Sequence, residues 1–146
     1  MVPLPERALV QRVVAMSSVG KVPGALSYSD VIRKHFLDPR NVGELADADG
    51  VGEAGNAACG DELRVFIRVN TAGALDGISF QAKACSAVIA VASMTTEALE
   101  GATTAQARAL DVDALVEQAG GVPRHKAHAP RVVRRALDAA LSAAGV

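Results

Sequence analysis

The sequence predicts an α+β domain in which a β-hairpin is followed by helices. Residues 63–70 alternate apolar and mostly polar side chains, as a strand with one buried face does, and residues 75–83 form a second arm after a glycine-containing turn. Directly after Cys85 the apolar spacing changes from two residues to the helical period. The hairpin is therefore expected to lead straight into a helix whose N-terminus lies at Cys85.

Before the hairpin the sequence predicts one short helix and a weak strand. Ser29 is suited to cap the helix, and Pro39 ends it because the residue before a proline disfavours helical geometry. Residues 41–56 hold four glycines and scattered acids without a helical stripe. They are expected to form a loop that leads into an irregular edge strand near residues 51–58.

After the hairpin helix, two short helices are expected over residues 104–110 and 111–118. Pro130 fits the first turn of a C-terminal amphipathic helix, which makes Ala129 its expected N-cap. The apolar stripe of that helix consists of Val133, Ala136, Leu137, Ala140 and Leu141.

The chain divides into an N-terminal arm with a linker, residues 1–26, and a domain over residues 27–146. Within the arm, residues 6–16 carry an apolar stripe of a short helix, and Pro23-Gly24 indicates a linker. The arm is expected either to dock on its own domain, a partner or a second copy, or to fray as a terminus.

Composition excludes several classes of function. The formal net charge of −1 argues against a nucleic-acid-binding surface over the whole chain, and no apolar run is long enough for a membrane span. Two cysteines without a secretory signal favour a reducing compartment, so a cytoplasmic location is expected. In such a compartment a thiol is a metal ligand, a nucleophile or core filler rather than half of a disulfide.

Four side chains are candidate metal ligands: Cys59, Asp61, Cys85 and His128. Cys59 and Asp61 leave an extended backbone on the same side, and Cys85 lies at a helix N-terminus, where the helix dipole favours a thiolate. Two thiolates, a carboxylate and an imidazole suit zinc and are a less usual set for a [2Fe-2S] cluster. Their spacing matches no compact zinc-finger pattern, so buried inert thiols and a solvated histidine stay open as alternatives.

Four segments in order resemble the U-type iron–sulfur cluster assembly scaffolds, the IscU/NifU N-terminal family. These are Lys34-His35-Phe36-Leu37-Asp38-Pro39-Arg40-Asn41-Val42-Gly43, Ala58-Cys59-Gly60-Asp61, Ala84-Cys85-Ser86-Ala87-Val88-Ile89-Ala90 and Lys126-Ala127-His128. The resemblance implies a three-stranded antiparallel sheet with helices packed on one face. It also implies a protein that receives iron and sulfur, assembles a cluster and passes it to apo-proteins.

The chain departs from that family at the position after His128, where the family has a third cysteine and this chain has Ala129. In the family that cysteine is the usual acceptor of persulfide sulfur from a cysteine desulfurase, so sulfur acceptance is in question. Ala129 is either natural or an engineered replacement. The stretch before the histidine, which the family uses for chaperone recognition, is also altered, at residues 121–126.

A basic run surrounds His128. It contains Arg124, His125, Lys126, Arg131, Arg134 and Arg135. The run is interpreted either as a solvated helix face or as an electrostatic dock for an acidic partner surface.

The leading hypothesis is a divergent scaffold or carrier, not an enzyme, that holds a [2Fe-2S] cluster or iron through Cys59, Asp61, Cys85 and His128. The alternative is an interaction or regulatory module stabilised by zinc at the same residues, without cluster assembly activity. A cysteine desulfurase and cluster-accepting apo-proteins are the partners that the resemblance implies. A homo-oligomer is also expected, because two copies together offer four thiolates.

Overall fold

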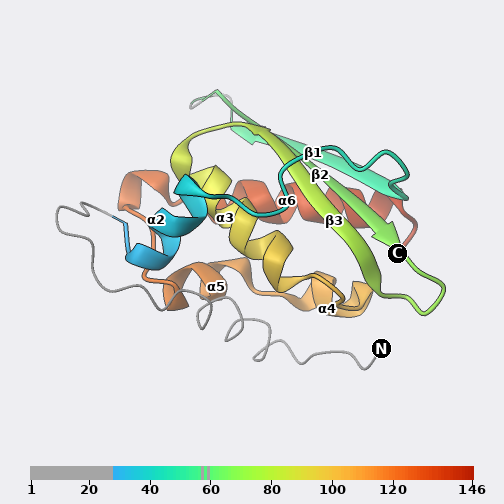
Figure 1. The fold of residues 1–146 in the computed structure, drawn as a ribbon. Helices are drawn as coiled ribbons and strands as arrows, with labels where there is room; N and C mark the ends of the chain where they lie inside the picture. The colour runs from blue at the N-terminus through green and yellow to red at the C-terminus, as the bar shows by residue number, and fades with distance from the viewer. Residues whose placement is uncertain (1–27, 57, 59) are drawn as a thin grey trace.

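The computed structural model describes residues 28–56, 58 and 60–146, so both the expected N-terminal arm and Cys59 lie outside the described residues. The elements in chain order are shown in Figure 1. They are α2 (Asp30–Leu37), β1 (Gly50–Asn56), β2 (Asp61–Val69), β3 (Leu75–Lys83), α3 (Ser86–Ala98), α4 (Thr104–Ala109), α5 (Val112–Gln118), a 3-10 helix, η1 (Arg124–Lys126), and α6 (Ala129–Ala143).

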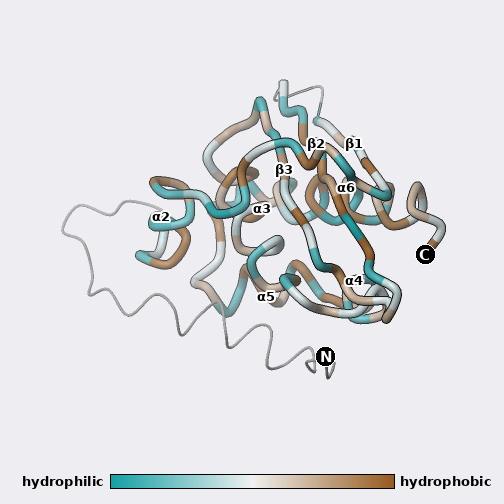
Figure 2. Tube along the Cα trace, turned by 45° about the vertical axis from the view of Figure 1, so that its right-hand side comes forward, coloured by the Kyte–Doolittle hydropathy of each residue, from teal (hydrophilic) through white to brown (hydrophobic). Residues whose placement is uncertain are grey.

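The three strands form one antiparallel sheet in the order β1-β2-β3, which confirms the predicted hairpin and the sheet that the family resemblance implied. Along β2 and β3, hydrophobic and hydrophilic bands follow one another in Figure 2. Asn56 at the end of β1 pairs with Asp61 at the start of β2, and Glu62 pairs with Lys83 near the end of β3. This register places the start of β2 beside the segment that leads from β3 into α3.

Helix α6 packs against β1, and close approach explains why that strand is rich in glycine (Figure 1). A Cβ atom on Gly52 would lie 2.2 Å from the carbonyl oxygen of Ala136, and one on Gly50 would lie 2.1 Å from that of Ala140. Only a residue without a side chain fits at this distance. The irregular edge strand of the prediction is therefore a regular strand whose sequence reflects the helix beside it.

Helix α3 is buried on nearly every side, which corrects the prediction of a single apolar stripe. Of its 13 residues, 11 are buried, including the polar Ser93, Thr96 and Glu97. The helix lies among α2, α6, α5 and β3, so no face of it is left to water. Its many alanines allow these neighbours to approach closely.

The outer face of the sheet is covered more than the alternating pattern predicted. Phe66 points away from the helices, yet only 3% of its surface is exposed. Residues 41–49 cross this face: Gly43 N–H donates to Phe80 at one edge, and Leu45 lies against Gly77. A loop without any periodicity thus covers part of the outer face of the sheet, and no pattern in its sequence predicts this.

A buried polar cluster joins α2 and the following loop to α3. Ser93 Oγ accepts a hydrogen bond from the Arg40 backbone N–H at 2.8 Å and lies 2.7 Å from His35 Nδ1. Burial lowers the pKa of His35 to about 4, with smaller contributions from the charges of Arg40 and Lys34. His35 is therefore neutral at pH 7, and the cluster fixes the loop that follows α2.

The remaining predictions about helices are largely confirmed. Ser29 caps α2 by accepting from the Ile32 N–H, as predicted. Asp111, which was expected to begin the next helix, is instead the N-cap of α5 and accepts from the Ala114 N–H. The predicted apolar stripe of the C-terminal helix is buried throughout. Among the described residues no helix is both long enough and apolar enough to cross a membrane.

Candidate metal centre

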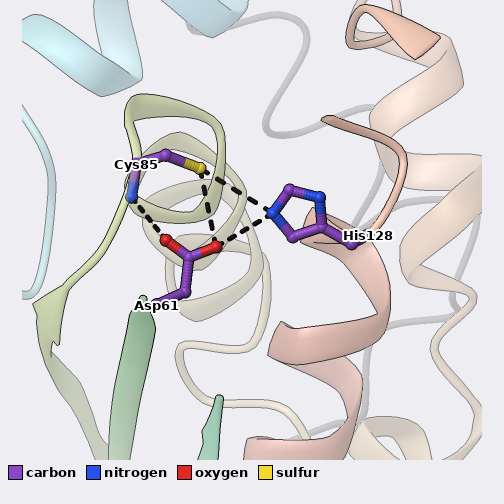
Figure 3. Close-up of side chains that lie close together, drawn as sticks. All are labelled: Asp61, Cys85 and His128. Carbon is purple, nitrogen blue, oxygen red and sulfur yellow. Dashed lines mark hydrogen bonds and ion pairs between the residues drawn. The ribbon is translucent and has the colours of Figure 1, made fainter. Parts of the chain in front are cut away.

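Asp61 forms the centre of a three-residue cluster at one end of the sheet (Figure 3). Its side chain is almost fully buried, and its two oxygens have different partners. Oδ1 accepts from the backbone N–H of Cys85 at 2.8 Å, and Oδ2 lies 2.9 Å from His128 Nε2. The strand register brings Asp61 beside the end of β3, so the carboxylate also fixes the start of α3.

Cys85 is the N-cap of α3, as the change of period predicted. Its backbone is extended, its side chain is partly buried, and no side chain caps the helix. The sulfur atom lies 3.8 Å from Asp61 Oδ2 and 4.0 Å from His128 Nε2. The unpaired N–H groups and the dipole at this helix end favour an anionic ligand there.

His128 is the N-cap of α6, which corrects the prediction that Ala129 would take that position. Ala129 instead begins the helix and is fully buried, with Pro130 in the first turn. Only 12% of the His128 side chain is exposed, and it points at Asp61 and Cys85. The helix start is therefore one residue earlier than proline placement indicated.

The three donor atoms lie close to, but not at, the separations that a tetrahedral metal ion requires. A carboxylate oxygen, the thiol sulfur and an imidazole nitrogen all lie within 4.8 Å of one another. Ligands at roughly 2.0–2.3 Å from a tetrahedral ion are separated by about 3.3–3.8 Å, so small side-chain movements would accommodate zinc or iron. In the structure, a hydrogen bond between His128 and Asp61 satisfies the buried carboxylate instead.

The structure brings together three of the four predicted ligands, from three separate segments. Cys59 lies outside the described residues, between the end of β1 at Asn56 and the start of β2 at Asp61. Metal binding by all four residues therefore stays a prediction.

Sequence reasoning missed one contact beside the cluster. The hydroxyl of Tyr28 lies 3.2 Å from Ser86 Oγ, and Ser86 directly follows Cys85. This contact ties the segment before α2 to the first residue of α3. Nothing in the local sequence around either residue indicates a pairing across 58 positions.

The chain matches the family model described as the NifU-like N-terminal domain over residues 27–144. Among curated relatives, the iron-sulfur cluster assembly scaffold protein IscU 1 of Archaeoglobus fulgidus is 42% identical over 114 residues, which cover 78% of this chain and 74% of the relative. The IscU scaffold protein of Azotobacter vinelandii is 34% identical over 119 residues, covering 80% of this chain and 92% of the relative.

Solved structures share the fold. A crystal structure of a SUF-system scaffold candidate from Fervidobacterium islandicum superposes with a TM-score of 0.65 at 17% identity, covering 78% of this chain and 96% of the other. The N-terminal part of a NifU-like protein from Brucella abortus gives 0.52 at 21% identity, covering 77% and 79%. At these identities the structures support the fold alone, while the family model and the relatives show that this chain belongs to the family of NifU-like N-terminal domains, the U-type scaffolds.

Proposed function

We propose that this protein is an iron–sulfur cluster assembly scaffold or carrier, which holds its cargo through Cys59, Asp61, Cys85 and His128. Its curated relatives carry the scaffold name, and its family is that of the U-type scaffolds. The protein would bind a cluster and hand it on without turning over a substrate. A cysteine desulfurase and cluster-accepting apo-proteins are the corresponding partners.

One observation carries this proposal: side chains from three distant segments converge with three different donor types. The carboxylate of Asp61, the thiol of Cys85 and the imidazole of His128 come from the start of β2 and the N-caps of α3 and α6. A fold that needed only stability would place apolar side chains at this point, because burying a carboxylate is costly. The arrangement instead retains groups that bind iron or zinc.

Each of the described ligands has a different role in binding the cargo. Cys85 supplies a thiolate at a helix N-terminus, where a negative charge is favoured. Asp61 is oriented by the Cys85 backbone N–H through one oxygen, which leaves the other free to exchange between His128 and an ion. His128 supplies an imidazole nitrogen. A mixed set with few thiolates donates less charge to iron and should hold a cluster less firmly than four thiolates.

Anaerobic reconstitution with ferrous iron and sulfide tests the proposal. Visible charge-transfer absorption should develop in the native sequence and fail to develop after Cys85→Ser or His128→Ala. Mössbauer spectra would identify the cluster type. Absence of these bands in a protein whose circular dichroism is native would refute the scaffold function.

An exposed histidine in the same chain provides the matched control. His125 lies in η1 and is solvent-exposed, so His125→Ala removes an imidazole close in sequence to His128 without touching the cluster of donors. Reconstitution of this variant should equal that of the native sequence. Equal loss in both variants would indicate that general disturbance of residues 124–128, rather than loss of a ligand, is responsible.

Zinc is the second candidate cargo, favoured by the chemical variety of the donors. One thiolate, one carboxylate and one imidazole suit zinc in the mixed sites that proteins build, and zinc would link three segments and so stabilise the fold. Elemental analysis after oxygen-free purification distinguishes the two cargoes. If the protein is instead a zinc-stabilised interaction module, Cys59→Ser should lower thermal stability and leave partner binding unchanged.

A further inference from the structure

Charge is unevenly distributed along the chain. Residues 118–137 contain five lysines or arginines and no acid, whereas residues 41–63 contain six acids and no lysine or arginine. The basic residues are Arg124, Lys126, Arg131, Arg134 and Arg135. A chain with a net charge of −1 therefore carries one strongly positive segment, at η1 and the first half of α6.

One of these five cations has a structural task. Arg134 donates to the carbonyl oxygens of Ala107 and Leu110 and pairs with Asp138, so it ties α6 to α4. Over the described part of the chain, the other four form no ion pair with a carboxylate. These four, Arg124, Lys126, Arg131 and Arg135, are here called the basic ridge.

The basic ridge begins at the edge of the candidate metal centre. His128 is the N-cap of α6, and residues three and seven positions further along a helix lie on the same face. Arg131 and Arg135 occupy those positions and are exposed, while Val132 and Ala136 beside them are buried. A positive surface thus extends along α6 from the residue that contacts Asp61 and Cys85.

The shape of the basic ridge suits a protein surface better than a small anion. Two hollows of the described part of the chain lie over the outer face of the sheet and near the β2–β3 turn, and neither of these two is lined by a ridge residue. The four side chains lie on a 3-10 helix and on the solvent side of α6. A nucleic acid is disfavoured because the whole chain holds one Tyr, three Phe and no Trp for base stacking.

We propose that the basic ridge is the docking surface for the acidic face of a protein that exchanges sulfur or a cluster at Cys85. This inference rests on the proposed function, because that function is what gives a partner a reason to bind. The attraction between the basic ridge and an acidic surface does not itself require a bound cluster. Complementary charge raises the rate of encounter and orients the partner, and both effects weaken with added salt. A partner held along α6 would have its reactive group beside Cys85.

The test measures how fast Cys85 reacts with charged peptides. In the Cys59→Ser background Cys85 is the remaining thiol. Three short peptides, rich in Glu, Gln or Lys, each carry one cysteine activated as a pyridyl disulfide, and release of pyridinethione reports thiol exchange. The acidic peptide should react about 10-fold faster than the neutral one at about 20 mM NaCl, and the advantage should vanish near about 300 mM.

Two variants of equal net charge separate the ridge from charge in general. Arg131→Gln/Arg135→Gln should reduce the acidic peptide's rate by roughly 3- to 10-fold and leave the neutral peptide's rate unchanged. Thr71→Glu/Ala72→Glu makes the same change in net charge at the exposed β2–β3 turn, at the opposite end of β2 from Asp61, and should have no effect. Equal effects in the two variants would overturn the proposal.

If Cys85 reacts slowly with all three peptides, the same comparison is made by binding. Fluorescence anisotropy then follows the binding of dye-labelled peptides without the activated disulfide. Equal affinity for the acidic and neutral peptides would contradict the proposal. So would tighter, ridge-dependent binding of a single-stranded oligonucleotide, since the ridge would then be a nucleic-acid surface. Because none of these measurements uses iron or sulfide, failed cluster reconstitution with a preserved preference for acidic peptides would refute only the scaffold function.

Discussion

Two histidine-containing polar clusters lie along the same helix, and they are built differently. At the N-terminus of α3, His128 and Asp61 meet Cys85, and the side chains of Cys85 and His128 are partly exposed. Two turns further along, His35 meets Ser93, whose hydroxyl also accepts from the Arg40 backbone. His35 and Ser93 are both buried.

The difference separates a structural cluster from a binding site. In the cluster around Ser93, the hydrogen-bonding groups stay paired at neutral pH, because His35 is uncharged there. In the cluster around Asp61, the carboxylate and the imidazole form a hydrogen bond with each other, and coordination of an ion by both groups would replace that bond. The first cluster should therefore control stability, and the second should control what the protein binds.

The largest expected effect is on cargo binding. Cys85→Ser should lower the affinity for zinc or the yield of reconstituted cluster by about 100-fold or more, because a thiolate ligand is lost. The free energy of unfolding of the metal-free protein should change by less than about 0.5 kcal/mol, since Ser is also a good N-cap. Competition with a chromophoric chelator and urea unfolding check the two expectations. A large loss of stability in the metal-free state would contradict the division between the clusters.

The next effect is on stability alone. Ser93→Ala should lower the free energy of unfolding by about 2–3 kcal/mol, because the Arg40 N–H and His35 lose a buried partner. Zinc affinity should stay within about 3-fold of that of the native sequence. Ser142→Ala is the control: Ser142 is exposed, and its hydroxyl accepts a hydrogen bond from the Arg108 side chain. Loss of metal binding after Ser93→Ala would show that the clusters are coupled through α3.

Acid should weaken the cluster around Ser93 over a defined range of pH. The pKa of His35 is about 4 in the folded protein and 6.5 without the fold, so the unfolded chain binds more protons between these values. This contribution to stability is complete above pH 6.5 and is lost as the pH falls towards 4, by up to about 3 kcal/mol.

Urea unfolding at several pH values tests that dependence. His35→Leu should flatten the fall in stability between pH 6.5 and 4, whereas replacing the exposed His125 with Gln should leave it unchanged. A pH dependence identical in the native sequence and His35→Leu would show that His35 is not the group responsible.

The smallest expected effect comes from restoring a thiol next to His128. Ala129→Cys should permit persulfide loading by a cysteine desulfurase, visible by mass spectrometry. Its cost in stability should be about 1 kcal/mol, because Ala129 is fully buried and the added sulfur must be accommodated. Ala127→Cys, exposed on the other side of His128, is the control and should load less. Equal loading of both variants would indicate unspecific transfer to any nearby thiol.

Local patterns predicted most of the fold because each depends on neighbours in the sequence. The alternation in residues 63–70 and the change of period at Cys85 fix β2 and the start of α3, since side-chain direction repeats every two residues in a strand and every 3.6 in a helix. Ser29 could be identified as a cap because its partner, the Ile32 N–H, is three residues away. Such features need no knowledge of distant segments.

The predictions that were wrong concern features that depend on distant segments. The glycines of β1 look irregular until α6 is placed against them, and Phe66 looks exposed until residues 41–49 cross the sheet. The polar residues of α3 look like an outer face until His35 and Arg40 are placed beside Ser93. Each depends on a contact between segments far apart in the chain, which no local periodicity records.

The sequence by itself determined the hairpin, the helices and the residue types able to bind a metal ion. It also identified the family through the order of its motifs, and it located the missing thiol at Ala129. Only the tertiary structure decided that Asp61 serves both Cys85 and His128, because their meeting requires strand register and the placement of two helix ends. A metal-binding site is a set of distances, and distances between remote residues exist only once the chain is folded.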